Sequence, residues 1–171
     1  MKKIFILILI LVTISLGVFF ITKSVNKKEN SINFVSNFNS ESIINIEDKV
    51  YGCEIIRNGV STEIVFQDPP SVNGMKMTWE NGKQKISFKN LEKNFNQLVI
   101  PENSFLNLVV KILDSIQSIP LSTVNSDGKY TTFKGKIDNT EFEFISDDNS
   151  YLQEIKIPSK NSKISFNYIN N

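Results

Sequence analysis

Alternation of apolar and polar residues, interrupted by turn dipeptides, most constrains how this chain of 171 residues can fold. Asn58-Gly59 and Asn81-Gly82 each lie between two alternating segments. Asn-Gly favours a type I′ turn, because both central residues of that turn need a positive φ. We therefore expect a tight hairpin at each dipeptide. Strands joined by such short turns run antiparallel.

The same two-residue period continues through most of the chain after residue 37. Asp68-Pro69-Pro70 ends one alternating segment, because proline has no backbone N–H to donate to a neighbouring strand. The pattern predicts strands at residues 42–47, 50–57, 61–67, 75–80, 85–89, 130–137, 141–146, 151–157 and 163–168. Further turns are expected at residues 48–49, 138–139, 147–150 and 158–161.

Residues 104–119 have a helical period instead. One face of this helix would carry Phe105, Val109, Ile112, Leu113 and Ile116, and the other Asn107, Lys111, Asp114, Ser115 and Ser118. Asn103 or Ser104 can cap its start, and Pro120 stops it. The fold class is therefore α+β, mainly antiparallel β, with one amphipathic helix across the concave face of a curved sheet.

An apolar run at residues 4–21 follows Met1-Lys2-Lys3. As a helix, 18 residues would span roughly 27 Å, close to the thickness of the hydrocarbon layer. Cleaved signal peptides usually have a shorter apolar core and a small-residue cleavage site, which Thr22-Lys23-Ser24 matches poorly. We expect an uncleaved single-pass anchor that places the domain outside the cytoplasm. Cleavage would make the protein secreted, and a buried soluble helix is the third alternative.

The domain organisation follows from these segments. Residues 1–22 form a signal-anchor or signal peptide, residues 23–37 a polar linker, and residues 38–171 the β-domain.

Nineteen basic and 18 acidic residues give a net charge of +1, and Arg57 is the only arginine. The chain therefore lacks the basic stripe that nucleic-acid binding requires.

The residues for common catalytic centres are missing or isolated. No histidine is present, which excludes Ser-His and Cys-His pairs and imidazole metal ligands. Cys53 is predicted to be a buried thiol, with a reactive nucleophile and a disulfide between two chains of a homodimer as alternatives. Glu141 and Glu143 indicate a solvated strand face, and residues 147–150 a hairpin turn rather than a calcium loop. We expect a protein that is not an enzyme and has no cofactor or metal.

A binding function remains as the alternative to catalysis, and the apolar residues predict where a ligand or partner would bind. Thirteen Phe, four Tyr and one Trp could line a cavity or pack an ordinary core. The candidate concavity or partner surface consists of Met75, Met77, Trp79, Phe105, Val109, Ile112, Leu113 and Ile116.

The stretch from Asp68-Pro69-Pro70 to Met75-Lys76-Met77-Thr78-Trp79-Glu80-Asn81-Gly82-Lys83 resembles that of the LolA-like lipoprotein carrier superfamily. The helix after Pro101 and the closing hairpins are similar to those of its small clostridial members, over residues 37–168. The resemblance implies a half-open barrel that holds acyl chains. Lys76 stands nearest to the basic residue that carriers often have after the proline turn, where this chain has no arginine.

Three hypotheses about function follow. The first is an accessory of another cell-envelope protein, since one clostridial germination member of the superfamily binds a peptidoglycan amidase. The second is a binder of lipid or lipoprotein acyl chains. The third is a carboxylate-dependent hydrolase. A filled core with an exposed strand edge would favour the first, a wide apolar pocket the second, and converging carboxylates the third.

Overall fold

The computed structural model describes residues 34–89, 91–95 and 100–169. The chain divides into two units, Met1–Asn30 and Ser31–Asn171, and every described residue belongs to the second. The predicted membrane segment at residues 4–21 lies outside the described residues, so the anchor stays a prediction. Across the part of the chain that the structure describes, no helix is both long and apolar enough to cross a membrane.

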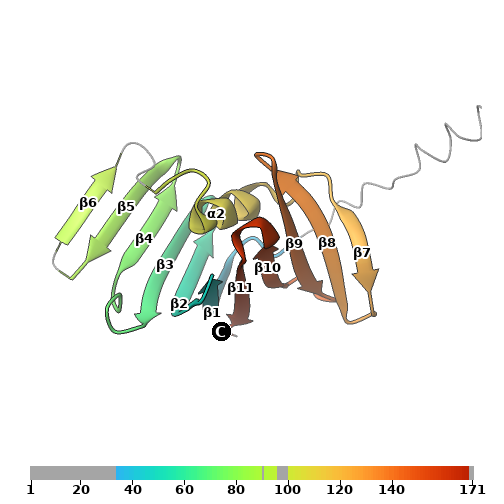
Figure 1. Cartoon of the computed structure of the whole chain (residues 1–171), viewed down its shortest axis with the longest axis horizontal. Helices are drawn as coiled ribbons and strands as arrows, with labels where there is room; N and C mark the ends of the chain where they lie inside the picture. The colour runs from blue at the N-terminus through green and yellow to red at the C-terminus, as the bar shows by residue number, and fades with distance from the viewer. Residues whose placement is uncertain (1–33, 90, 96–99, 170–171) are drawn as a thin grey trace, which may run out of the picture. The chain divides into compact units, whose positions relative to one another are not determined.

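The described strands form one antiparallel sheet of 11 strands in the order β6-β5-β4-β3-β2-β1-β11-β10-β9-β8-β7 (Figure 1). They are β1 (Phe38–Ile46), β2 (Lys49–Asn58), β3 (Ser61–Asp68), β4 (Lys76–Glu80), β5 (Lys83–Phe88), β6 (Leu91–Phe95), β7 (Ser122–Ser126), β8 (Tyr130–Ile137), β9 (Thr140–Asp147), β10 (Leu152–Ile157) and β11 (Ser162–Tyr168). Pairing of β1 with β11 joins the two halves of the chain.

The turn residues confirm one Asn-Gly hairpin and correct the other. Asn81 and Gly82 both have positive φ, 50° and 73°, as a type I′ turn requires. At the other site Asn58 pairs with Ser61, so the two central residues are Gly59 and Val60. Only Gly59 has a positive φ, 60°, which is the pattern of a type II′ turn. The predicted type I′ turn at Asn58-Gly59 was therefore wrong, because the register is shifted by one residue.

Two strands, β6 and β7, were not predicted, and they are the two edges of the sheet. All five residues of β7 are exposed, and Leu91 of β6 is 77% exposed. β7 buries neither face, and such an edge strand has no reason to alternate in polarity, so the two-residue period is missing there. The central strands were predicted because each of them buries one face.

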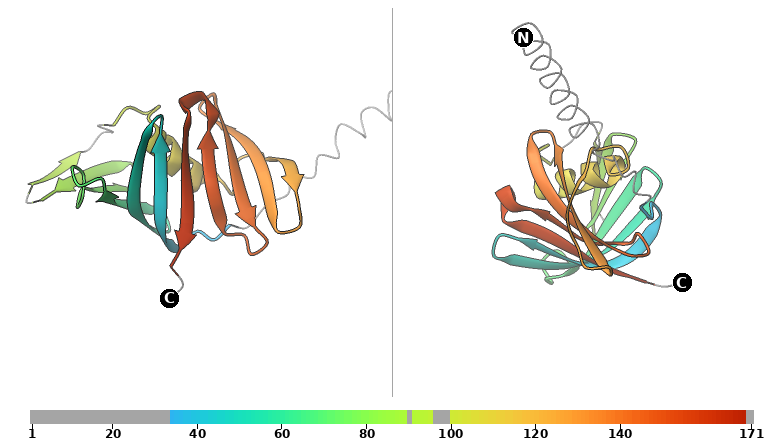
Figure 2. Two further views of the ribbon diagram at one scale, coloured as in Figure 1. Left: turned by 60° about the horizontal axis from the view of Figure 1, so that its bottom comes forward. Right: turned by 90° about the vertical axis from the view of Figure 1, so that its right-hand side faces the viewer.

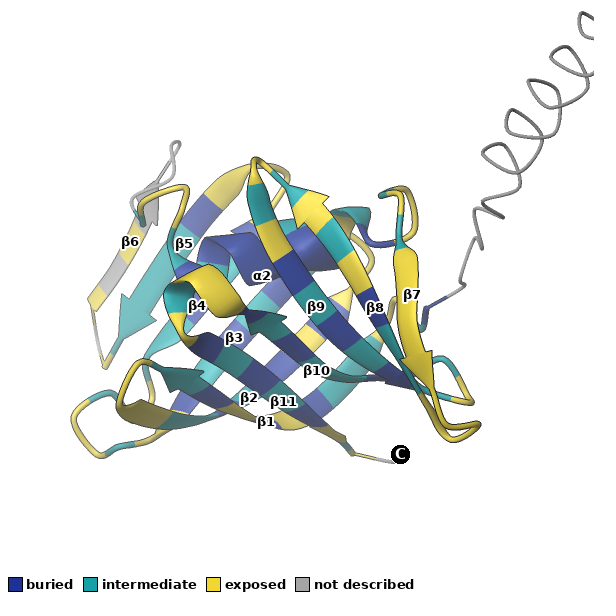
Figure 3. Cartoon of the chain, turned by 45° about the vertical axis from the view of Figure 1, so that its right-hand side comes forward, coloured by how far each residue is buried: buried dark blue, intermediate teal, exposed yellow. Residues whose placement is uncertain are grey.

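Helix α2 (Phe105–Ser115) lies across the concave face of the curved sheet (Figures 2 and 3). The Ser104 side chain accepts a hydrogen bond from the Asn107 backbone, which confirms Ser104 as the cap. The helix ends four residues before the predicted end at residue 119. The Ser115 hydroxyl donates to the Lys111 carbonyl, and the Ser118 hydroxyl donates to the Ser115 carbonyl. Such side-chain bonds compete with the backbone hydrogen bonds that would continue the helix.

Gly135 of β8 is a position where the sheet leaves no room for a side chain. A Cβ there would lie 2.5 Å from Cζ of Phe142 and 2.9 Å from Cδ2 of Leu121. We expect Gly135→Ala to lower the free energy of unfolding by about 2 kcal/mol through overpacking. Urea denaturation measures this, with Lys136→Ala, at an exposed position of the same strand, as the control. Equal stability of the two variants would contradict the predicted close packing.

Candidate functional site

The eight residues predicted to line the concavity meet at the interface between α2 and the sheet. Seven of them have 8% or less of their surface exposed, and Met75 is partly buried against the same core. Val109 and Ile112 are completely buried. The apolar face of the helix therefore packs directly on the concave face of the sheet. Whether any of these residues contacts a ligand or a partner stays a prediction.

Asn107 joins the beginning of α2 to strands β4 and β5. Its Oδ1 accepts hydrogen bonds from Nε1 of Trp79 at 2.7 Å and from Nε2 of Gln84 at 2.9 Å. Its Nδ2 donates to the carbonyls of Ile100 at 2.7 Å and Pro101 at 2.8 Å. The prediction that Asn107 lies on the polar face was wrong: it is 2% exposed, because a buried indole N–H needs an acceptor.

Arg57 of β2 makes a second polar link, near the end of α2. Its guanidinium donates to Oγ1 of Thr62 at 2.6 Å and to the carbonyl of Leu113 at 3.1 Å, and lies 2.9 Å from the Asp114 carboxylate. Arg57 is 6% exposed, so these contacts offset the cost of burying its charge. In the sequence Arg57 stands out only as the single arginine, and its position at the end of an alternating segment gives no signal of this role.

The chain enters the domain over the concave face, through residues 34–38. Phe34 is 8% exposed and packs edge-on against Phe144 and Phe133, with ring centroids 5.0 and 6.3 Å apart. Gln117 donates a hydrogen bond to the Phe34 carbonyl at 3.2 Å. Asn37 accepts one from the Gly59 backbone at 2.7 Å. The described end of the predicted polar linker is therefore part of the packed domain, while the boundary at residue 37 stays a prediction.

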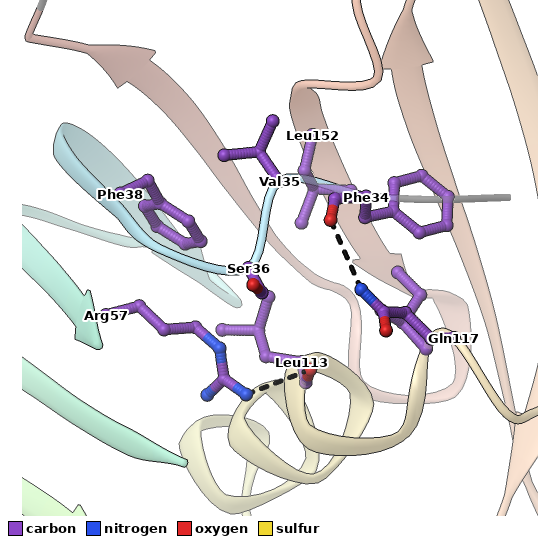
Figure 4. Close-up of a pocket in the computed structure, with 9 residues that line it drawn as sticks. Phe34, Val35, Ser36, Phe38, Arg57, Leu113, Gln117 and Leu152 are labelled. Atoms are coloured by element: carbon purple, nitrogen blue, oxygen red, sulfur yellow. Dashed lines mark hydrogen bonds between the residues drawn. The ribbon is translucent and has the colours of Figure 1, made fainter. Parts of the chain in front are cut away.

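A small cleft lies between this entering segment and α2 (Figure 4). Its volume is about 20 Å³, enough for about one water molecule. Small-molecule pockets are commonly on the order of hundreds of Å³. The cleft is lined by Phe34, Val35, Ser36, Phe38, Arg57, Leu113, Ile116, Gln117 and Leu152. In this state it does not accommodate an acyl chain.

The carboxylates considered for catalysis make structural contacts. Glu143 pairs with Lys134 at 2.8 Å, and Glu141 is exposed on the same strand face. Oδ1 of Asp147 accepts hydrogen bonds from the backbones of Asn149 and Tyr151, which confirms a hairpin turn there. Among the described residues, no group of three or more Cys, Asp or Glu is placed to hold a metal ion.

No protein-family model and no curated protein matches the chain. Among solved structures, an uncharacterized conserved protein from Thermus thermophilus matches with a TM-score of 0.51 and 8% identity, over 80% of each chain. A LolA superfamily protein from Nitrosomonas europaea matches with a TM-score of 0.46 and 9% identity, over 86% of this chain and 91% of that one.

A third similar structure is that of the CwlD amidase from Clostridioides difficile in complex with the GerS lipoprotein. It matches with a TM-score of 0.40 and 10% identity, over 71% of this chain and 78% of that one. At such low identities the likenesses concern the fold. The Thermus protein shares the fold of this chain, and membership of the LolA-like superfamily stays a prediction.

The Asn107 contacts generate a prediction about stability. Asn107→Ala removes the acceptor of the buried Trp79 N–H and one hydrogen bond of Gln84, and we expect a loss of about 3 kcal/mol in the free energy of unfolding. Trp79 is the only tryptophan, so its fluorescence follows both the local change and unfolding in urea. Asn167→Ala, at an exposed position, is the control. A loss no larger than that of the control would show that the buried amide contributes nothing.

Cys53 is 1% exposed, and burial raises the pKa of its thiol to about 12. We expect a thiol-specific disulfide reagent at pH 8.5 to react at least about a hundred times faster with the urea-unfolded chain than with the folded chain, since the thiolate is the nucleophile. Between the ordinary pKa of 9.0 and about 12 only the unfolded chain loses the proton, so rising pH should lower stability in that window. Rapid labelling of the folded chain would contradict the buried thiol.

Proposed function

We propose that this protein is a non-enzymatic accessory of the cell envelope that binds another protein on its outer surface. The filled concave face carries this proposal. Seven of the eight residues predicted to line a cavity pack against one another, and the cleft beside them measures about 20 Å³. Among the described residues the apolar side chains of α2 pack on the sheet, which supports a binding surface outside this interface.

Two polar links oppose opening of the interior. Asn107 holds the beginning of α2 to the sheet through its hydrogen bonds with Trp79 and Gln84, and Arg57 holds its end through the Leu113 carbonyl and Asp114. Lifting the helix would break the bonds to Trp79 and Arg57, at a cost of about 1–3 kcal/mol for each buried polar group left unpaired. Opening a cavity wide enough for an acyl chain therefore requires that several of these hydrogen bonds break at the same time.

The place of action follows from the predicted apolar run at residues 4–21. As an uncleaved anchor it would tether the domain to the outer side of the cell membrane, where a partner of the cell envelope is within reach. The resemblance to the clostridial germination member makes a peptidoglycan amidase the first partner to test.

The alternative function is binding of a lipid or of lipoprotein acyl chains. The mainly apolar lining of the cleft, including Phe34, Leu113 and Ile116, favours it. Such a ligand would have to displace the entering segment or α2, since the cleft itself is too small.

The test is to purify the tagged full-length chain from membranes of its native host, including sporulating cells, in mild detergent. Mass spectrometry is then applied to both the co-eluting proteins and the extracted lipids. We expect one protein in stoichiometric amount and acyl lipid no higher than in a mock purification from untagged cells. Retained lipid in stoichiometric amount without a protein partner would refute the accessory function and support the alternative.

A further inference from the structure

The convex face of the sheet, on the side away from α2, carries ion pairs that hold several of its carboxylates (Figure 2, left view). Glu63 of β3 pairs with Lys76 of β4 at 2.8 Å. Glu154 of β10 lies 2.8 Å from Lys156 of its own strand and 3.1 Å from Lys163 of β11. On these strands the charge of each carboxylate is therefore offset by a lysine of the same face.

Strands β1 and β2, at the centre of the sheet, differ from this pattern. The register places Glu41 directly opposite Glu54. Like charges in directly opposite positions destabilise a sheet. Among the described residues neither carboxylate has an ion-pair partner, and the one hydrogen bond to them comes from Nδ2 of Asn39 to Oε1 of Glu54, at 2.9 Å. One oxygen of Glu54 and both of Glu41 therefore stay available to a donor from outside.

Apolar side chains flank these two carboxylates on the same face. Ile43, two residues after Glu41, is 53% exposed, and Ile56, two residues after Glu54, is 37% exposed. Ile43 lies opposite Gly52, which offers it no side-chain neighbour on β2. A single exposed isoleucine needs no explanation, whereas two of them beside unpaired carboxylates form a mixed surface. We call this surface the β1–β2 patch, and it consists of Glu41, Ile43, Glu54 and Ile56.

The charges around the β1–β2 patch do not neutralise it. On the neighbouring strands of this face, Lys76 is bound by Glu63, and Lys163 is bound by Glu154. Asp68, exposed at the end of β3, lies beside Gly52 and adds a further carboxylate. The patch and its surroundings are therefore acidic.

The sign of this charge decides between the possible occupants. A second copy that docked through the same patch would place carboxylates against carboxylates. An anionic membrane surface would be repelled in the same way. A protein surface that presents cationic side chains beside apolar ones complements both the carboxylates and the isoleucines.

We infer that the β1–β2 patch binds a segment of a partner protein in which lysine or arginine alternates with apolar side chains. The cationic groups bind to Glu41 and Glu54, and the apolar side chains cover Ile43 and Ile56. This inference rests on the proposed function, in which the chain binds another protein, and it assigns the binding surface and the chemistry of the partner.

The test uses the full chain in a non-ionic detergent and two fluorescein-labelled peptides, Lys-Val-Lys-Val-Lys and Glu-Val-Glu-Val-Glu. By fluorescence anisotropy we expect the basic peptide to bind at least about ten times more tightly than the acidic one. Added salt should weaken this binding, because it screens exposed charges. Carbodiimide coupling of the bound basic peptide should join its lysines to Glu41 or Glu54, which mass spectrometry of the digested product identifies.

The variant Glu41→Lys should weaken binding of the basic peptide at least about tenfold. It replaces two opposed like charges by an opposite-charge pair, so its midpoint in urea denaturation should be no lower than that of the wild type. A loss of binding then cannot come from unfolding. The control Glu102→Lys makes the same change of charge at an exposed position before α2 and should bind as the wild type does.

Three results would overturn the inference. They are equal binding of the two peptides, equal binding of the basic peptide by Glu41→Lys and the wild type, and coupling of the peptide only to other carboxylates. Co-purification from host membranes separates these failures from failure of the proposed function. If Glu41→Lys retains a protein partner as the wild type does, the proposed function stands and the partner binds elsewhere. If the wild type retains none, the proposed function itself fails.

Discussion

Packing of α2 on the concave face of the sheet is the interaction on which the rest of the structure depends. The sheet curves around α2 (Figure 2), whose residues Val109 and Ile112 are completely buried. Apolar packing alone would tolerate sliding of the helix, since the hydrophobic effect is non-directional. The hydrogen bonds of Asn107 and Arg57 add direction, because Asn107 fixes the beginning of the helix to β4 and β5 and Arg57 fixes its end to β2. Apolar packing therefore holds the helix against the sheet, and the hydrogen bonds set its orientation.

The two faces of the sheet differ in the side chains that they carry. The concave face is occupied by α2 and by Phe34, so its aromatic residues stabilise the fold. The convex face carries paired charges, for example Lys76 with Glu63 and Lys134 with Glu143. Such exposed pairs contribute little to stability and keep the face solvated. The β7 edge, Ser122–Ser126, contains no charged residue.

Prediction from the sequence succeeded where one side of an element is buried. The strands around Ile64 and Phe144 were found from their alternation, and α2 from its apolar face. It failed at β6 and β7, where no alternation exists, and at Asn107, whose polar side chain was placed toward solvent. Nothing in the local pattern shows that an amide on a helix will meet Trp79 from a strand 28 residues earlier.

The sequence by itself determined the fold class, the Asn81-Gly82 turn, the buried side of each central strand and the absence of histidine chemistry. These properties depend on local periods and on residue types, which are visible along the chain. Only the tertiary structure decided that the apolar face of α2 packs on the sheet and that β7 is an edge of the described sheet. An inward apolar side chain is the same in a core and in a cavity until the opposing element is placed. Likewise, a strand becomes an edge only through the pairing of all the other strands.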